Sequence, residues 1–143
     1  MRHFSLLLGL FVTFNVQADL TADDAGQAFA IGMRAYEAED YERAAQILEE
    51  VVKIQPECVR CVHLLGKSYG RMTEQANWVR VLGLARKTRN AFEQAVELAP
   101  DDVRVVEDLI NFYRSAPRFL GGSAEKAERL ERRLHQSETD HTG

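Results

Sequence analysis

Apolar residues recur every three or four positions along most of this 143-residue chain, which is the spacing that places them on one face of an α-helix. The pattern also repeats: PECVRCVHLLGKSYG, from Pro56, and PDDVRVVEDLINFYR, from Pro100, share six identical positions out of fifteen. A third copy lies upstream, with Ala28, Ile31 and Gly32 followed by Tyr41, Ala44, Leu48 and Val51. Because a single copy cannot bury its own apolar face, the sequence predicts an all-α array of stacked copies.

The copies resemble the tetratricopeptide repeat, a helix-turn-helix unit of about 34 residues. In the second copy the matching small and bulky residues are Val62, Leu65, Gly66, Tyr69, Phe92, Ala95 and Pro100. A small residue such as Gly66 should let two helices approach closely. The resemblance covers roughly residues 25–134 and implies about three helix-turn-helix pairs, at about 25–56, 57–100 and 101–134. The stretches YGRMTEQANW, FEQAVELAPDD and APRFLGGSAEKA are also similar to exported bacterial tetratricopeptide-repeat proteins that have a lengthened second hairpin and an Ala-Pro/Gly-Gly loop.

The second copy is longer than the unit it resembles. Pro56 and Pro100 are 44 positions apart, which is about ten more than the unit requires. The added residues keep the helical spacing of apolar side chains and contain no proline. Divided between two helices, they would lengthen each one by about 7.5 Å. The second hairpin should therefore protrude.

The first eighteen residues, MRHFSLLLGLFVTFNVQA, have the features of a secretory signal: a basic Arg2, an apolar run and a small residue at the expected cleavage point. The apolar run is shorter than the roughly 20 residues that span a bilayer, so we expect no stable membrane anchor. Residues 19–135 should form one helical domain and residues 136–143 a polar disordered tail, in a protein exported to the periplasm or secreted. The net charge of −4 disfavours nucleic acid as a partner.

The stretch CVRCVH, from Cys58, contains the only two cysteines of the chain. It does not fit haem attachment, because Val62 separates His63 from the second cysteine, and it offers too few ligands for zinc. We therefore expect no cofactor and no metal. Cys58 and Cys61 should have Cα atoms about 5 Å apart, within reach of a disulfide. The alternatives are a structural bridge, two packed thiols, or a redox site favoured by the start of a helix.

The first helices of tetratricopeptide repeats line a concave groove that binds extended peptides, so the resemblance implies such a groove here. Its residues would be Phe29, Met33, Tyr36, Arg60, His63, Lys67, Arg71, Arg104, Asn111 and Arg114. This set begins apolar and becomes basic, although the chain as a whole is acidic. The pattern predicts an acidic peptide or a free C-terminal carboxylate as the ligand. The alternative is an ordinary solvated helix face.

Catalytic groups do not emerge from the sequence, because its acidic residues fall mainly on exposed helix positions or at helix starts, where they complement the helix dipole. Gly121-Gly122 lacks the spacing of a phosphate-binding loop and is typical of a tight turn before a helix capped by Ser123. The sequence therefore favours a non-catalytic adaptor or scaffold that binds another protein or peptide. The alternative is a thiol-disulfide oxidoreductase that uses Cys58 and Cys61.

Two turns should lie side by side, because all turns within pairs emerge along one edge of such a stack. The first carries Trp78 and Val79, and the second carries Phe119 and Leu120. Burying one large apolar side chain contributes about 1.5 to 3 kcal/mol, so we expect the second turn to fold against the hairpin and cover Trp78. The alternative leaves Trp78 exposed as an anchor for a partner.

Overall fold

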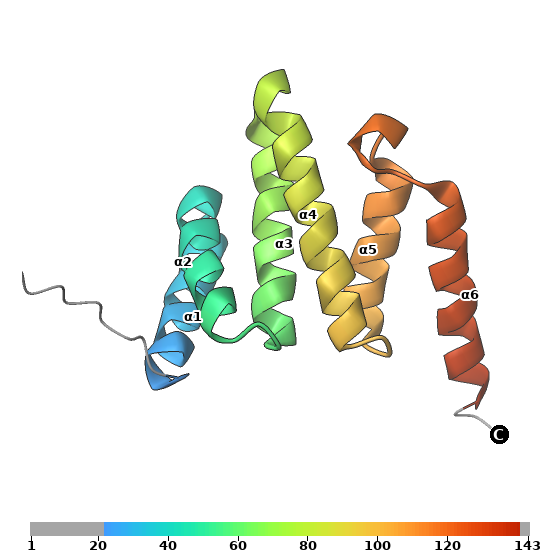
Figure 1. Ribbon diagram of the computed structural model, residues 1–143, viewed down its shortest axis with the longest axis horizontal. Coiled ribbons are helices and arrows are strands. Elements are labelled where there is room, and N and C mark those ends of the chain that lie inside the picture. Colours follow the sequence, from blue (N-terminus) through green and yellow to red (C-terminus); the bar gives the residue numbers. More distant parts are fainter. Residues whose placement is uncertain (1–21, 141–143) are drawn as a thin grey trace, which may run out of the picture.

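The computed structural model describes residues 22–140, and this range is all-helical. The elements are α1 (Ala22–Glu37), α2 (Tyr41–Ile54), α3 (Val59–Gln75), α4 (Trp78–Leu98), α5 (Val103–Ser115), the 3-10 helix η1 (Arg118–Leu120) and α6 (Ala124–Asp140). They form three helical pairs, α1–α2, α3–α4 and α5–α6, set side by side in one row (Figure 1). The predicted all-α array of about three pairs is confirmed.

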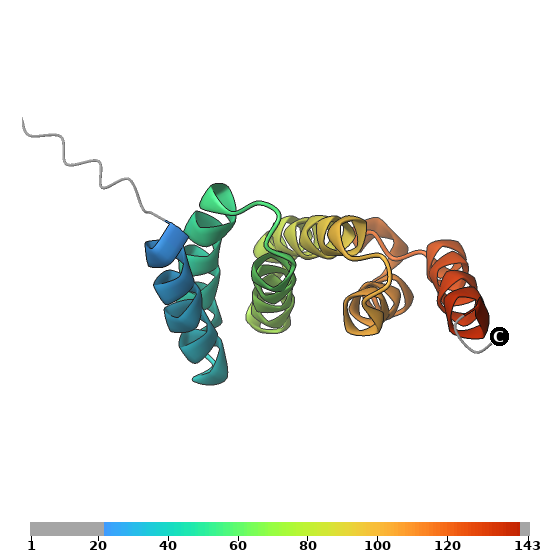
Figure 2. The same cartoon turned by 90° about the horizontal axis from the view of Figure 1, so that it is seen from below.

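The row has two different sides. Seen from below, α3 and α5 lie on one side of it, and α4 lies on the other (Figure 2). Neighbouring pairs are joined by the packing of α2 against α3 and of α4 against α5. α4 therefore lies behind the space between α3 and α5.

The second hairpin protrudes, as the sequence predicted. α3 has 17 residues and α4 has 21, against 13 in α5, and the tip of the hairpin rises beyond its neighbours (Figure 1). Asn77 lies in the turn and caps α4, because its side-chain oxygen accepts a hydrogen bond from the Arg80 amide at 3.2 Å. Such a cap satisfies one of the free amides at the start of a helix.

Small residues allow the helices of a pair to approach closely. A Cβ atom added to Gly66 on α3 would lie 2.7 Å from Cδ1 of Phe92 on α4. A Cβ atom added to Gly32 on α1 would lie 3.1 Å from Cγ of Leu48 on α2. Both partners belong to the buried core, which is packed too tightly to yield space at low cost. The role that the sequence indicated for Gly66 is confirmed.

A three-residue contact between pairs occurs twice. The Tyr69 hydroxyl on α3 donates a hydrogen bond to Glu49 on α2, and the Lys87 ammonium lies 4.9 Å from the centre of the tyrosine ring. One repeat further on, the same contact is made by Tyr113, Glu93 and Lys126. Partial burial, together with the bonded carboxylate, raises the pKa of both tyrosine hydroxyls well above its ordinary value. The sequence aligned the two tyrosines but did not identify their partners.

The two ends of the chain differ in what the structure describes. The predicted signal peptide, residues 1–18, lies outside the described residues. At the other end α6 continues to Asp140, in place of the disordered tail predicted from residue 136. Residues 124–140 contain neither proline nor glycine, so the sequence has no signal that would end the helix earlier. Among the described helices, none is both long and apolar enough to cross a membrane.

Candidate functional site

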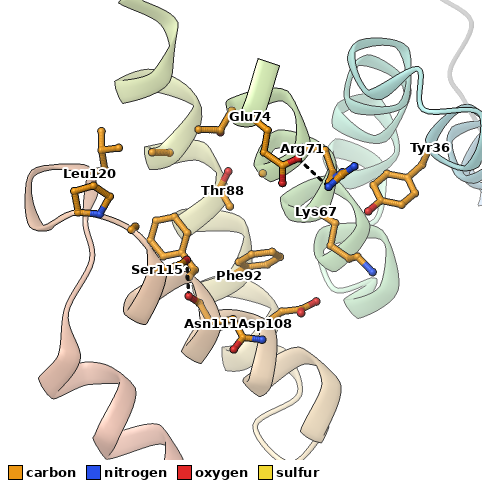
Figure 3. Close-up of a pocket in the computed structure, with 16 residues that line it drawn as sticks. Tyr36, Lys67, Arg71, Glu74, Thr88, Phe92, Asp108, Asn111, Ser115 and Leu120 are labelled. Carbon is orange, nitrogen blue, oxygen red and sulfur yellow. Dashed lines mark hydrogen bonds and ion pairs between the residues drawn. The ribbon is translucent and has the colours of Figure 1, made fainter. Parts of the chain in front are cut away.

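A cavity of about 410 Å³ lies between α3 and α5, with α4 behind it. Figure 3 shows Thr88 and Phe92 of α4 between the two flanking helices, while Tyr36 of α1 and Leu120 of η1 lie at opposite ends. The cavity is open on the side of the row that α3 and α5 form, so a ligand could enter between these helices.

The floor of the cavity is mainly apolar. Ala85, Phe92 and Phe112 contribute to it, and Leu120 extends it toward the loop. Thr88 adds little polarity, because its hydroxyl donates a hydrogen bond to the Leu84 carbonyl at 2.9 Å within α4. An apolar side chain of a ligand would therefore be desolvated here without leaving a polar group of Thr88 unsatisfied.

Charged residues of both signs surround this floor. Arg71 is already engaged: its guanidinium lies 2.8 Å from Glu74 and donates a hydrogen bond to the Tyr41 hydroxyl at 3.3 Å. Asp108 is also engaged, by His63 at 2.7 Å across the gap between α5 and α3. Lys67 lies 5.7 Å from the centre of the Tyr36 ring and makes no ion pair within residues 22–140. Lys67 is therefore the rim cation that remains available to a ligand.

The tyrosine beside Lys67 is also suited to contact a ligand. Partial burial and, to a smaller extent, the neighbouring Tyr41 raise the pKa of the Tyr36 hydroxyl, whereas Arg71 acts in the opposite direction. The hydroxyl is therefore protonated under all ordinary conditions and can donate a hydrogen bond. Together with Lys67 it places two donors at one end of the cavity.

Four of the ten residues predicted to line a groove do line this cavity: Tyr36, Lys67, Arg71 and Asn111. The other six do not, and five of them contact other residues. The Arg60 guanidinium lies 4.7 Å from the centre of the Phe29 ring. Arg104 lies 3.4 Å from Asp102 at the start of α5, and Arg114 lies 2.7 Å from Glu131 on α6. His63 does not line the cavity but contacts two residues that do, Asp108 and Phe92, and Met33 lies outside it.

The acidic residues at the rim, Glu74 and Asp108, and the apolar floor were not predicted from the sequence. Asp108 lies four positions after Arg104 and three before Asn111, so helical spacing alone could have placed it on the groove-facing side. Phe112 follows Asp108 by the same four positions. The pattern indicated a basic groove, whereas the described residues form a site of mixed charge.

The two cysteines are joined by a disulfide, with Sγ atoms 2.01 Å apart and Cα atoms 5.2 Å apart. Cys58 is the residue immediately before α3, and Cys61 is buried in its first turn. The bridge that the cysteine spacing allowed is therefore present. The side chain of the nearby His63 is hydrogen-bonded to Asp108 and to neither cysteine sulfur. Among residues 22–140 no group of three His, Cys, Asp or Glu side chains could hold a metal ion.

The prediction that the hairpin tip packs against the second turn is wrong. Trp78 is 85% exposed and Phe119 is 77% exposed, and Val79 is exposed as well. The loop does approach α4, but it does so at Arg89, whose side chain lies beside Gly121. Arg89 is eleven residues after Trp78, or about 16 Å along the helix, so the loop lies too far down α4 to cover the tip. Only Leu120 is partly covered, at the cavity.

The loop itself has the form that the sequence indicated. Gly121 has a φ of 102°, a left-handed conformation that favours glycine. Ser123 caps α6, because its hydroxyl accepts a hydrogen bond from the Lys126 amide at 3.3 Å. The Ser123 amide in turn donates to the Tyr113 carbonyl at 2.8 Å, which ties the loop to the end of α5. The interpretation as a tight turn followed by a helix cap is confirmed.

Comparisons with known proteins do not assign the chain to a family: no family model matches it, and neither does any curated protein. The function has to be inferred from the cavity, the cysteine pair and the exposed surfaces.

Proposed function

We propose that this protein is a non-catalytic interaction module that binds an extended peptide segment in the cavity between α3 and α5. The observation that carries the proposal is an open cavity with an apolar floor, a free cation and several hydrogen-bonding groups at its rim. Ligand sites commonly have this composition: apolar walls supply affinity, and a few polar groups fix orientation. The resemblance of the sequence to the tetratricopeptide repeat, whose groove binds extended peptides, supports the same function, and the predicted signal sequence supports a location in the periplasm or outside the cell.

The chemistry of the cavity suggests what such a peptide contains. An apolar side chain would occupy the floor around Phe112 and Leu120. The Asn111 amide at the rim can both donate to and accept from a peptide backbone. An acidic side chain or a terminal carboxylate of the peptide would pair with Lys67, which makes no ion pair within the described residues. The proposed ligand is an apolar residue next to an acidic group.

Peptides selected from a random linear library should contain this pair of groups, and the Lys67→Glu variant should bind them about tenfold more weakly. Lys67 is a better test than Arg71, because reversing Arg71 would also break its contacts with Glu74 and Tyr41. Isothermal titration calorimetry measures the affinities. Arg133→Glu on α6, at an exposed position outside the cavity and in no ion pair within the described residues, is the matched charge control. An equal loss of affinity in both variants, or a library that yields no binding peptide, would contradict the proposal.

A second candidate function, thiol-disulfide exchange, is favoured by the positions of the cysteines. Cys58 is partly exposed before the first turn of α3, whereas Cys61 is 1% exposed. In the reduced protein, a thiolate at Cys58 would be favoured by the helix N-terminus and could attack a substrate disulfide. Cys61 would then displace the substrate by attacking the Cys58 sulfur, which restores the bridge.

Insulin reduction by dithiothreitol separates the two candidates. Because we propose a non-catalytic module, we expect the protein not to accelerate the reduction above the rate with dithiothreitol alone. An acceleration that disappears in Cys58→Ser would establish the oxidoreductase instead. An acceleration that persists in Cys58→Ser would come from a contaminant, and this variant is therefore the necessary control.

A further inference from the structure

Four large apolar side chains are exposed at one edge of the row. Trp78 and Val79, at the tip of the second hairpin, and Phe119 in η1 are the most exposed, and Leu82, one turn further along α4, is 59% exposed. The hairpin tip and the loop that contains η1 point toward the same edge (Figure 1). We name these four residues the apolar edge patch.

Two residues of the patch on α4, Trp78 and Leu82, face the loop, whereas Val79 borders a hollow on the side of α2. Arg89 contacts the loop, because its guanidinium lies 2.9 Å from the position that a Cβ atom would take on Gly121. Leu82 and Trp78 precede Arg89 by seven and eleven residues, which are about two and three turns. They therefore lie on the same face of α4 as Arg89, above the point where the loop crosses. The patch therefore has two parts at one edge, the hairpin tip and the loop.

Unpaired positive charge lies on the loop side of the patch, although the chain has a net charge of −4 and acidic residues of the α1–α2 turn lie beside the base of the tip. Residues 75–92 contain four cations and no acidic residue, and residues 115–123 add one more cation. Arg80 and Lys87 lie 2.7 and 3.2 Å from glutamates of α2 and are neutralised by them. The remaining three cations make no ion pair within the described residues: Arg86, Arg89 and Arg118.

We propose that the apolar edge patch docks reversibly on an anionic lipid surface, a property that goes beyond peptide binding. Tryptophan and phenylalanine favour the boundary between headgroups and acyl chains, because their rings are large and largely apolar. Arginines beside them are attracted to the negative potential of acidic lipids. Trp78 and Phe119 enter this boundary, while Arg86 and Arg118 stay at the level of the phosphates.

The shape of the edge favours a lipid surface over a protein partner. The patch consists of side chains on two separate projections, the hairpin tip and the loop, whereas the cavity lies between α3 and α5 (Figures 1 and 3). A protein partner would need a surface complementary to both projections, as stable interfaces are packed almost as densely as protein interiors. A lipid surface accepts separate side chains without such a fit.

Trp78 is the only tryptophan in the chain, so it reports directly on this surface. In buffer its emission should be that of a water-exposed indole. Vesicles of phosphatidylcholine with phosphatidylglycerol should shift the emission to the blue and protect it from iodide, and brominated acyl chains should quench it. Vesicles of phosphatidylcholine alone should have much smaller effects, and high salt should weaken the binding.

Variants then test which residues bind. Vesicle flotation should show about tenfold weaker binding for Phe119→Ser, Leu82→Ser and Trp78→Ser, because each removes a large apolar group. Arg86→Glu with Arg118→Glu should weaken binding to anionic vesicles at least as much. Val103→Ser and Arg133→Glu, at exposed positions away from the patch, are the matched controls. All variants carry the same residues 1–21, so differences between them report on the patch and not on the N-terminal segment.

The outcomes are distinct. A blue shift with anionic vesicles that Phe119→Ser reduces and the control variants retain supports the proposal. Three results overturn it: no shift of Trp78, equal binding to neutral vesicles, or unchanged binding in the patch variants. If light scattering shows self-association that Trp78→Ser abolishes, without any binding to vesicles, the patch is an interface between copies of this chain. Because the substituted positions are exposed, the variants should fold as the wild type does, and the wild-type fluorescence needs no substitution.

Discussion

Gly66→Ala is expected to destabilise the fold by about 1 to 3 kcal/mol, although alanine is the better helix former. The added Cβ atom would lie 2.7 and 2.8 Å from two carbons of the Phe92 ring and 3.1 Å from Cβ of Ala91. Phe92 is buried between the second and third pairs, so its ring cannot retreat without disturbing both. Urea denaturation followed by circular dichroism measures the change in the free energy of unfolding.

Gly70→Ala is the matched control for this prediction, because Gly70 lies one turn later on the same helix. Its added Cβ atom would lie 3.6 Å from the Thr88 methyl carbon, which is an ordinary contact distance. Removing the flexibility of a glycine inside a helix should then stabilise the protein by about 0.5 to 1 kcal/mol. The change in the free energy of unfolding should therefore have opposite signs at these two glycines, although both lie on α3. If Gly66→Ala also stabilises the fold, α3 and α4 are not held at the separation that the structure shows.

A double substitution identifies the source of the strain. Phe92→Leu shortens the side chain that the new methyl group would meet, so the cost of Gly66→Ala should be smaller in the Phe92→Leu background. The coupling between the two sites should reach at least about 0.5 kcal/mol, as expected for residues in contact. Additive effects would place the strain elsewhere, for example at Ala91.

The fold was predictable because it depends on local patterns that recur. Tyr69 and Tyr113 occupy matching positions in two aligned stretches, and the helical spacing continues through the added residues of the second hairpin. Each of these patterns predicts the structure of one repeat. Because a repeat array is built mainly from contacts between neighbouring units, the structure of the units largely determines the fold. Gly66 could be assigned to a close approach of helices for the same reason.

The site was only partly predictable, because charges on different helices pair across the groove. Register along α3 and α5 placed Lys67 and Asn111 on the side of the helices where the cavity lies. It could not show that Asp108 pairs with His63 across 45 positions of sequence, or that Arg114 pairs with Glu131 on α6. Such pairs depend on the separation and rotation of helices, which the spacing of apolar residues does not fix.

The error about Trp78 has a related cause. The sequence correctly placed the hairpin tip and the loop at one edge, but it did not give the height at which the loop crosses α4. That height is set by short-range bonds of the loop itself, chiefly from the Ser123 amide to Tyr113 and from the Gly122 amide to Pro117. These bonds keep the loop close to the end of α5 and leave the longer hairpin uncovered.

Gly122→Ala should disrupt these bonds and have a larger local effect than Gly66→Ala. An added Cβ atom would lie 1.7 Å from the Ala116 carbonyl oxygen and 3.2 Å from that of Pro117. Both obstacles belong to the backbone, so no change of side-chain rotamer can relieve them. The turn must open, at a cost at or above the upper end of the roughly 1 to 3 kcal/mol typical of overpacking.

The consequences should be confined to the last pair and the adjacent end of the cavity. Opening the turn would release the Ser123 amide from Tyr113 and withdraw Leu120 from the cavity. α6 packs against α5 and has no other large contact in the described range, so the loss of this connection should free it. Because each pair of a helical array is stabilised mainly by its neighbours, α1 to α3 should stay folded.

Hydrogen exchange followed by mass spectrometry can resolve this pattern. In Gly122→Ala, peptides from α6 and the end of α5 should exchange much faster than in the wild type, and those from α1 to α3 should be unchanged. Gly83→Ala is the control, since an added Cβ atom there has no atom within 4 Å. Uniformly faster exchange along the chain would show that the array unfolds as one unit, whereas unchanged exchange would show that the loop has another stable form. Only a loss of protection confined to the last pair supports a loop that borders one end of the cavity and holds α6 in place.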